Sequence, residues 1–302
     1  MEYSCLPEST GNFSLILICL GIPFHVLIAK ILAKDLELTL PRHKILFCLS
    51  LSDGLQISLV ALFYPFIRAF HLTTSSNTCI VLRKILLFSS VVTVVVSSLS
   101  LVALSIERYI ACVHSFRLYE VLTNRRICAA ITIFWSLGTV LGIYAIFSDD
   151  ISNKETIVGE TRSFQIIAST VITLTTIIIT VVQVSLFRLS RKKMSQVSPS
   201  SAFGSEAEYS DLRKKQVKVA VIAGIVVLAY IVCMVPMSSV FILEKCKVLT
   251  VSKSVRASVI MFGMTNTLFD PFVYGIGILD IRRAIKRHIM GVVDYFYNCN
   301  LL

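Results

Sequence analysis

Charged side chains are scarce in this sequence. Asp, Glu, Lys and Arg make up 16% of its 302 residues, and its mean hydropathy is +0.80. A soluble domain carries about a quarter charged residues, because its surface faces water. The low charge content therefore excludes an ordinary soluble domain and indicates a membrane protein.

The motifs of common enzymes and transporters are also missing. The chain has no His, Cys, Asp and Glu cluster at metal-ligand spacing, no Gly-rich phosphate loop and no serine nucleophile elbow. It has no repeat of about 20 to 50 residues and no matching pair of broken helices in two halves. We therefore expect no catalytic activity, and the pattern disfavours a transporter or channel.

The N-terminal residues lack the features of a cleavable signal peptide. Residues 1–12 have neither a basic start nor a following small-residue cleavage site, so the first apolar segment should act as its own anchor. Asn12 begins a glycosylation sequon, Asn12-Phe13-Ser14, but it lies almost against that segment. This closeness disfavours glycosylation of Asn12.

Apolar residues are concentrated in seven blocks, each long enough to cross roughly 30 Å of hydrocarbon as a helix. The blocks are Leu15–Ile31, Ile45–Phe70, Ile85–Ala111, Ile127–Phe147, Phe164–Leu189, Val217–Leu243 and Val255–Leu279. They predict an all-α membrane protein, a seven-transmembrane helix bundle over residues 15–279. Residues 1–14 form a short tail before it, and residues 280–302 follow it.

Basic residues alternate from loop to loop and predict the orientation. The net charge is +11, and Lys and Arg cluster after the first, third, fifth and seventh blocks. Short basic loops stay in the cytoplasm, so residues 1–14 should be extracellular and the C-terminus cytoplasmic. Because these charges lie beside the bilayer, we expect no nucleic-acid partner.

The residues after the seventh block alternate between apolar and basic at helical spacing. Isoleucines at 281, 285 and 289 recur on one face, and Arg282, Arg283, Lys286 and Arg287 lie between them. This pattern predicts a short amphipathic cytoplasmic helix that lies along the anionic inner leaflet of the lipid bilayer.

Ionisable residues inside the apolar blocks are the first candidates for function, since they are costly there. Glu107 and Arg108 close the third block, and Asp53 and Asp270 lie inside the second and the seventh. Two carboxylates side by side in a low dielectric need a cation or a shared proton. The sequence leaves open a sodium ion, a proton shared by the two acids, and a contact between Asp53 and His25.

Three of the nine cysteines fall in the predicted extracellular segments, namely Cys5, Cys79 and Cys246. Three thiols allow one intramolecular pair at most. A Cys5–Cys246 disulfide would join the N-terminal tail to the third outer loop, and the other pairings stay open.

Three motifs then appear on the third, sixth and seventh blocks in turn: Glu107-Arg108-Tyr109, Cys233-Met234-Val235-Pro236 and Asp270-Pro271-Phe272-Val273-Tyr274. With seven spans and an extracellular N-terminus, this combination resembles the rhodopsin-like (class A) G-protein-coupled receptors. The resemblance covers nearly the whole chain. It implies a plasma-membrane receptor whose partners are an extracellular ligand, a heterotrimeric G protein, arrestin and a receptor kinase.

Local stretches such as Leu40-Pro41-Arg42, Asp53-Gly54-Leu55-Gln56 and Thr123-Asn124-Arg125-Arg126 look like those of fish odorant receptors. The likeness implies an odorant-like small molecule as ligand. The alternative is an orphan class A receptor of another branch, for a peptide, a lipid or another ligand.

The resemblance also implies roles for individual residues. The activation switch and G-protein contact would comprise Glu107, Arg108, Tyr109, Phe116, Pro236, Asp270, Pro271 and Tyr274. An allosteric sodium ion would be held by Asp53, Ser97, Asn266 and Asp270. No other cofactor is implied.

The ligand cavity implied by the family is apolar with one hydroxyl group. Its lining would comprise Ser90, Val94, Met234, Met237, Phe241, Ile260 and Met264. Ser90 stands where amine receptors have an aspartate, which disfavours a biogenic amine. Met264 stands where opsins have the retinal-binding lysine, which excludes a Schiff-base photoreceptor.

The chain also departs from the family pattern. His25 replaces the usual asparagine of the first span, Thr175 the usual proline of the fifth, and Met234 the usual tryptophan of the sixth. The second outer loop has no cysteine, so the family's outer disulfide cannot form. Arg83, Lys84 and Arg256 form either a basic rim for an acidic ligand or interfacial anchors.

Overall fold

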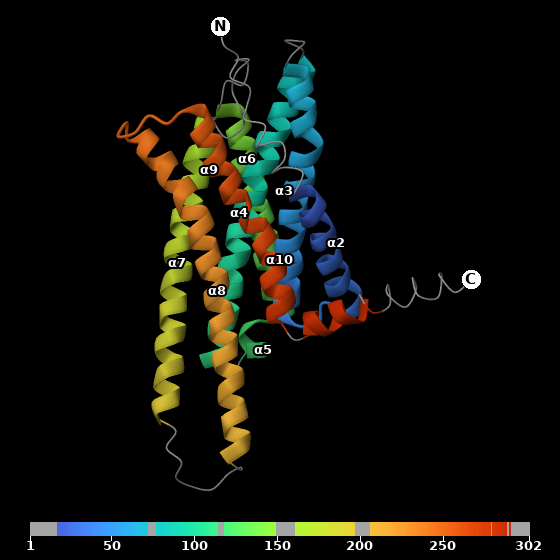
Figure 1. The fold of residues 1–302 in the computed structure, drawn as a ribbon, viewed down its shortest axis with the longest axis vertical. Helices are drawn as coiled ribbons and strands as arrows, with labels where there is room; N and C mark the ends of the chain where they lie inside the picture. Colours follow the sequence, from blue (N-terminus) through green and yellow to red (C-terminus); the bar gives the residue numbers. More distant parts are fainter. Residues whose placement is uncertain are drawn as a thin grey trace, which may run out of the picture.

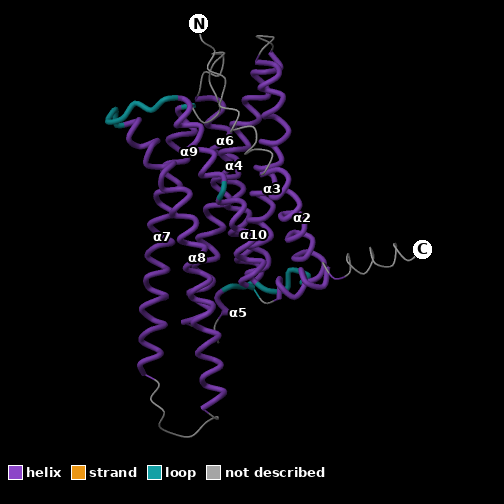
Figure 2. Tube along the Cα trace, viewed as in Figure 1, coloured by secondary structure: helices purple, strands orange, loops and turns teal. Residues whose placement is uncertain are grey.

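The computed structural model describes residues 17–71, 77–113, 118–148, 161–196, 206–278, 280–288 and 290. Throughout these ranges the regular structure is helical and no strand occurs (Figure 2). The predicted all-α bundle is therefore confirmed, as expected for a membrane protein whose backbone groups must be satisfied within each segment.

Seven helical stretches correspond to the seven predicted spans. The first is built from η1 (Leu17–Gly21), α2 (Ile22–Lys30) and η2 (Ile31–Asp35), and the seventh from α9 (Lys253–Met264) and α10 (Asn266–Gly277). The other five are α3 (Pro41–His71), α4 (Asn77–Val113), α6 (Asn124–Ser148), α7 (Arg162–Gln196) and α8 (Glu206–Lys245). A short helix, α5 (Leu118–Val121), lies between α4 and α6.

Local sequence explains where several helices begin and break. Pro41 starts α3, where its missing N–H is not needed. Ser252 caps α9, because its hydroxyl accepts a hydrogen bond from the Val255 amide at 3.3 Å. At Thr265 the seventh span breaks into α9 and α10, and the Thr265 hydroxyl donates to the Phe262 carbonyl at 2.6 Å.

Helix α4 is the central element of the bundle, with α3, α6, α7 and α8 among its neighbours (Figure 1). Gly138 and Gly142 let α6 approach closely, because a Cβ at Gly138 would lie 3.1 Å from the Val92 carbonyl oxygen and one at Gly142 would lie 2.8 Å from the Phe88 ring. Small residues spaced four apart permit this kind of contact between membrane helices.

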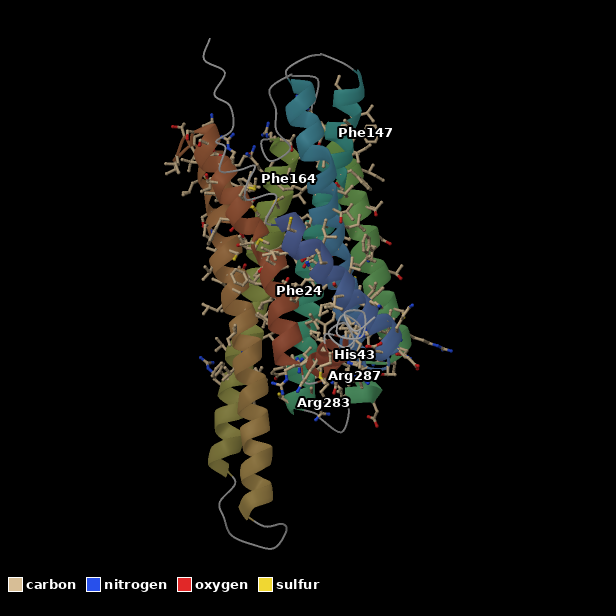
Figure 3. The ribbon with its side chains drawn as sticks, turned by 45° about the vertical axis from the view of Figure 1, so that its right-hand side comes forward. Phe24, His43, Phe147, Phe164, Arg283 and Arg287 are labelled. Carbon is tan, nitrogen blue, oxygen red and sulfur yellow. The ribbon has the colours of Figure 1, made fainter. Side chains whose placement is uncertain are left out.

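The surface of the bundle is apolar where it would face lipid. On α6, Ile133, Val140 and Phe147 are largely exposed, and Figure 3 shows Phe147 near one end of the bundle. Within the described residues, four stretches are long and apolar enough to cross a membrane: Ile80–Val113, Asn124–Ser148, Arg162–Leu189 and Gly224–Lys245. The chain is therefore a multi-pass membrane protein.

The two ends of the bundle are named here by one residue each. The Arg108 end carries the last turns of α4, the starts of α3 and α6, and the helical segment 280–288, which lies across the helix ends in Figure 1. The Phe241 end carries the last turns of α8 and the first turns of α7 and α9. The candidate functional residues fall at these two ends and in the layer between them.

Candidate functional site

At the Arg108 end, Glu107 and Arg108 form an ion pair on the last turns of α4. The Arg108 Nε lies 3.7 Å from the Glu107 Oε2. The Glu107 carboxylate is buried, and its Oε2 has no hydrogen-bond partner, whereas the Arg108 side chain is 18% exposed. The Glu107 carboxylate is thus removed from solvent, whereas the Arg108 guanidinium keeps partial exposure.

A second ion pair lies beside the first. Arg42, in the first turn of α3, donates from Nη2 to Oδ2 of Asp280 at 2.6 Å, which ties α3 to segment 280–288. Arg42 also interacts electrostatically with Glu107. Glu107 is therefore attracted by two arginines, and one of these arginines is itself held by the C-terminal segment.

His43 is buried next to Arg42 at the same end, and neither of its ring nitrogens has a hydrogen-bond partner (Figure 3). It precedes the predicted span Ile45–Phe70. Burial lowers the pKa of His43, and the positive charge of Arg42 lowers it further, while Asp280 acts in the opposite direction. The imidazole is consequently neutral in the folded protein near pH 7.

In the middle of the bundle, Asp53 and Asp270 come together from α3 and α10. Both are buried and interact electrostatically with each other, and Ser97 of α4 also interacts with Asp53. Asn266 Nδ2 donates to Asp270 Oδ2 at 3.3 Å. The four residues of the predicted sodium site are thus brought to one place.

Three oxygens of this group have no hydrogen-bond partner: both carboxylate oxygens of Asp53 and Oδ1 of Asn266. Buried polar atoms are normally satisfied, so orphaned oxygens need an explanation such as an ion, a water or a proton. Carboxylate and amide oxygens are the donors that hard cations prefer. The residues present therefore fit a small monovalent cation.

One alternative for these acids is wrong. His25 does not contact Asp53, because its Nε2 is 2.9 Å from the Thr267 carbonyl oxygen and its Nδ1 is 3.2 Å from the Ser50 hydroxyl. His25 instead joins α2, α3 and α10 by hydrogen bonds.

A hydroxyl cluster in the core was missed by sequence reasoning. The Tyr230 hydroxyl on α8 lies 2.8 Å from Oγ1 of Thr175 on α7 and 3.3 Å from Oγ of Ser98 on α4. Tyr230 is almost completely buried. A tyrosine among the apolar residues of the sixth block was the available signal, since a buried phenol needs a partner.

Five of the predicted ligand-lining residues belong to one apolar cluster, which runs through the core of the whole bundle. Val94, Met234, Met237 and Phe241 are buried members of it, and Ile260 packs against them. Ser90 and Met264 are partly buried. Phe164, which the sequence did not single out, meets Phe241 edge-to-face with 6.2 Å between ring centroids. The buried members of the predicted lining set are therefore part of the bundle core.

The predicted basic rim is altered by an ion pair. Arg256 of α9 binds Glu244 of α8 in a bidentate manner, with Nε to Oε2 at 3.1 Å and Nη2 to Oε1 at 2.5 Å. Its charge is neutralised, so Arg256 is not a free cation for an acidic ligand. Cys246, on the same turn, is a free and exposed thiol, which makes the expected Cys5–Cys246 disulfide wrong.

Some predicted site residues lie outside what the structure describes. Phe116, Cys5 and the side chains of Cys79 and Tyr274 are among them.

The other residues of the predicted activation switch are described. Pro271 is buried within α10, and Pro236 lies inside α8 with its ring exposed. Tyr109 is partly buried next to Arg108 in the sequence. In the described ranges, no three His, Cys, Asp or Glu side chains gather as a metal site.

The geometry therefore combines seven helical stretches, a charged pair at one end, two neighbouring acids in the middle and an apolar cluster that runs through the core. The model of the family "7 transmembrane receptor (rhodopsin family)" matches residues 25–274 of the chain. The chain belongs to this family. A comparison with curated proteins found no match.

Membership confirms the resemblance to class A receptors and the seven-helix bundle. The matched range runs from His25 to Tyr274, so it contains the ion pair, the two acids and the apolar cluster. The receptor departs from the family pattern at His25, Thr175 and Met234. The structure assigns hydrogen bonds to the first two, and places Met234 in the apolar cluster.

Proposed function

We propose that this receptor binds an odorant-like extracellular small molecule and activates a heterotrimeric G protein. It acts in the plasma membrane, with its N-terminus extracellular and its C-terminus cytoplasmic, and it has no enzymatic activity of its own. Arrestin and a receptor kinase would end the signal. The rearrangement involves the third, sixth and seventh spans, which here are α4, α8 and α9–α10.

The observation that carries the proposal is the Glu107–Arg108 pair at the proposed cytoplasmic end. The arginine is always charged and is partly accessible. A helix of the G protein that enters beside α4 would offer carbonyl groups to Arg108. Because the pair is long at 3.7 Å, modest competing contacts are enough to redirect Arg108.

The moving element is α8, in which Pro236 removes one backbone hydrogen bond of the helix. A ligand shifts the balance between two positions of α8 only by the difference in its affinity for them. Contacts between the ligand and Met234, Met237 or Phe241 would make that difference, because all three lie on α8.

The apolar cluster favours a small apolar ligand. Phe164, Val94 and Met237 offer no charge, and the Arg256 guanidinium is already paired with Glu244. An amine or a strongly acidic ligand would therefore lose its hydration without gaining a charged partner. A neutral odorant-like molecule would bind here with the smallest loss of hydration free energy.

A nucleotide-exchange measurement tests the coupling proposal. Membranes that contain the receptor and a co-expressed G protein should exchange guanine nucleotide, and Arg108→Ala should reduce the rate about 10-fold or more, as expected when a buried charged contact is lost. Arg125→Ala is the matched control, because Arg125 is an exposed cation on the neighbouring α6 at the same end. Equal rates in Arg108→Ala and Arg125→Ala would contradict the proposal.

A ligand panel tests the odorant proposal separately. Volatile and water-borne odorants should raise or lower cAMP in cells that carry the wild type, but not in cells that carry Arg108→Ala. A response to peptides or lipids, with none to odorants, would replace the odorant ligand and leave the receptor function standing.

We also propose that a sodium ion is held by Asp53, Ser97, Asn266 and Asp270, where it would neutralise the two carboxylates. The thermal midpoint of the purified receptor should be higher in NaCl than in KCl at equal ionic strength. This difference should vanish in Asp53→Asn, which keeps the size and removes the charge. A wild-type midpoint that is the same in both salts would contradict the sodium site and favour a proton shared between the acids.

A further inference from the structure

Two buried atoms of opposite charge at the Arg108 end lack a hydrogen-bond partner among the described residues. One is Oε2 of Glu107, which lies 3.7 Å from Arg108. The other is Nε of Arg42, whose Nη2 already binds Asp280 at 2.6 Å. Buried polar atoms are normally satisfied, so an unused acceptor and an unused donor at the same end need an explanation.

Arg42 is attracted by two carboxylates on different elements. It lies in the first turn of α3, binds Asp280 of segment 280–288 and also interacts electrostatically with Glu107 of α4. The arginine side chain is long and carries five N–H donors in one plane. Rotation of the side chain can therefore change its partner while α3 stays in place. In this structure Arg42 takes the position at Asp280.

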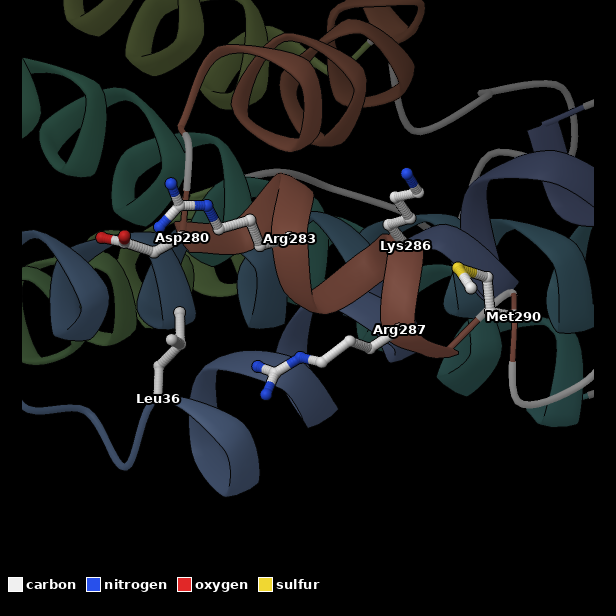
Figure 4. Close-up of a pocket in the computed structure, with 6 residues that line it drawn as sticks. All are labelled: Leu36, Asp280, Arg283, Lys286, Arg287 and Met290. Carbon is white, nitrogen blue, oxygen red and sulfur yellow. The ribbon is translucent and has the colours of Figure 1, made fainter.

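The two acids differ in what they lose when Arg42 leaves. The Asp280 side chain is 39% exposed and lines a hollow of about 520 Å³, where water can hydrate it (Figure 4). Arg283 follows Asp280 by three residues on the same helix and is a favourably spaced second cation. The Glu107 side chain is only 4% exposed, so water cannot replace a counter-ion there. Arg42 is therefore needed more at Glu107 than at Asp280 once Arg108 has moved away.

The proposed coupling to a G protein creates this situation, because it turns Arg108 away from Glu107 and leaves a buried charge unpaired. We infer that Arg42 then moves from Asp280 to Glu107 and becomes its replacement counter-ion. The same transfer breaks the ion pair between α3 and segment 280–288, so this segment is released when Arg108 is redirected. Arg42 is thus a positioning residue of the switch, and this role rests on the proposed function.

Hydrogen exchange of the purified receptor tests the transfer without a G protein. Arg108→Ala removes the partner of Glu107 and leaves Arg42 intact. The backbone amides of residues 280–288 should then exchange about two- to five-fold faster than in the wild type, because an exposed ion pair that holds the segment is lost. Adding Glu107→Gln removes the charge that attracts Arg42 and should restore the wild-type rate.

Unchanged exchange in Arg108→Ala would overturn the inference, and so would fast exchange that persists after Glu107→Gln is added. Arg125→Ala is the matched control, because it removes an exposed cation at the same end and should leave residues 280–288 unaffected. Arg42→Gln breaks the ion pair directly and sets the upper limit of the rate. Thermal midpoints show whether each variant is folded, and the comparison of Arg108→Ala with its double variant keeps Arg42 unchanged.

Nucleotide exchange on a G protein separates a transfer from a simple structural tie. Arg42→Gln and Asp280→Asn break the same ion pair, so a simple tie predicts effects of the same sign. The transfer predicts opposite signs. Arg42→Gln should lower the rate about five-fold, since Glu107 loses its replacement counter-ion, whereas Asp280→Asn frees Arg42 and should raise the basal rate about two-fold.

Arg42→Lys keeps a cation that can pair with either acid, so it should retain more nucleotide exchange than Arg42→Gln. Effects of the same sign in Arg42→Gln and Asp280→Asn would overturn the transfer and leave the G-protein coupling standing. A wild type that catalyses no nucleotide exchange would contradict the coupling itself, and the hydrogen-exchange comparison would then decide the transfer by itself.

Discussion

Tyr230 joins three helices through one hydroxyl group. Its partners, Thr175 and Ser98, lie on α7 and α4, while Tyr230 itself lies on α8, the proposed moving helix. Thr175 also donates to the Val171 carbonyl at 2.8 Å, so its hydroxyl is not orphaned when the tyrosine is absent. Tyr230 therefore stabilises the observed position of α8 against α4 and α7. Its loss would leave the Thr175 hydroxyl on α7 still hydrogen-bonded.

Tyr230→Phe should lower the free energy of unfolding in detergent by about 1 kcal/mol, the usual value of one buried neutral hydrogen bond. It should also raise the basal rate of nucleotide exchange, because α8 loses a link to α4 and α7. Thermal unfolding and the exchange assay measure the two effects.

The control for this change is Tyr144→Phe, which removes a hydroxyl from an exposed tyrosine on α6. It should leave both quantities unchanged. If Tyr230→Phe is as stable as the wild type, the hydroxyl cluster does not contribute to the fold.

At the scale of elements, the contact between α4 and α6 depends on two glycines one helical turn apart. Gly142 faces the Phe88 ring and Gly138 faces the backbone of Val92. Without a hydrophobic driving force between helices in lipid, such close packing is what holds α6 in place. The exposed outer face of α6 contributes nothing to this contact.

Gly142→Leu should destabilise the receptor by about 1–3 kcal/mol, the usual cost of overpacking, because its side chain would collide with Phe88. The measurement is the thermal midpoint of purified protein. Gly224→Ala is the control, since a Cβ there would meet only ordinary contacts at 3.5 Å and beyond. Equal midpoints for Gly142→Leu and the wild type would mean that α6 shifts freely against α4.

At the scale of the whole molecule, the Arg108 end is a meeting point of distant parts of the chain. Arg42 and His43 from α3, Glu107 from α4 and Asp280 from the C-terminal segment interact there. The charges of this end therefore bear on the stability of the bundle as well as on coupling.

His43 should make that stability dependent on pH. Its pKa is lowered in the folded protein by burial and by Arg42, so below about pH 6.5 the unfolded chain binds more protons than the folded chain. The free energy of unfolding should thus fall as the pH drops from 7 toward 5. In His43→Gln this fall should be smaller, as measured by thermal midpoints in detergent.

His288 is a second histidine at the same end, 3.5 Å from Asp35. The variant His288→Gln therefore serves as the comparison. Parallel pH curves for the wild type and His43→Gln would contradict the role of His43.

The charged residues of the site could be predicted from the sequence, but the contacts between helices could not. Glu107, Arg108, Asp53 and Asp270 stood out because charge in an apolar block is costly wherever it lies. His25 also stood out, but the sequence left open whether it contacts Asp53. Whether the His25 ring meets Asp53 or the Thr267 carbonyl depends on how α2 is rotated against α3 and α10.

The sequence by itself determined the seven helical spans and the places where charge enters them. Within a membrane each helix satisfies its own backbone, so length and hydropathy are enough to define a span. Only the tertiary structure decided which polar groups meet: Tyr230 with Thr175, Arg42 with Asp280, and Arg256 with Glu244. These meetings depend on the rotation and register of helices far apart in the chain, and no local pattern encodes either.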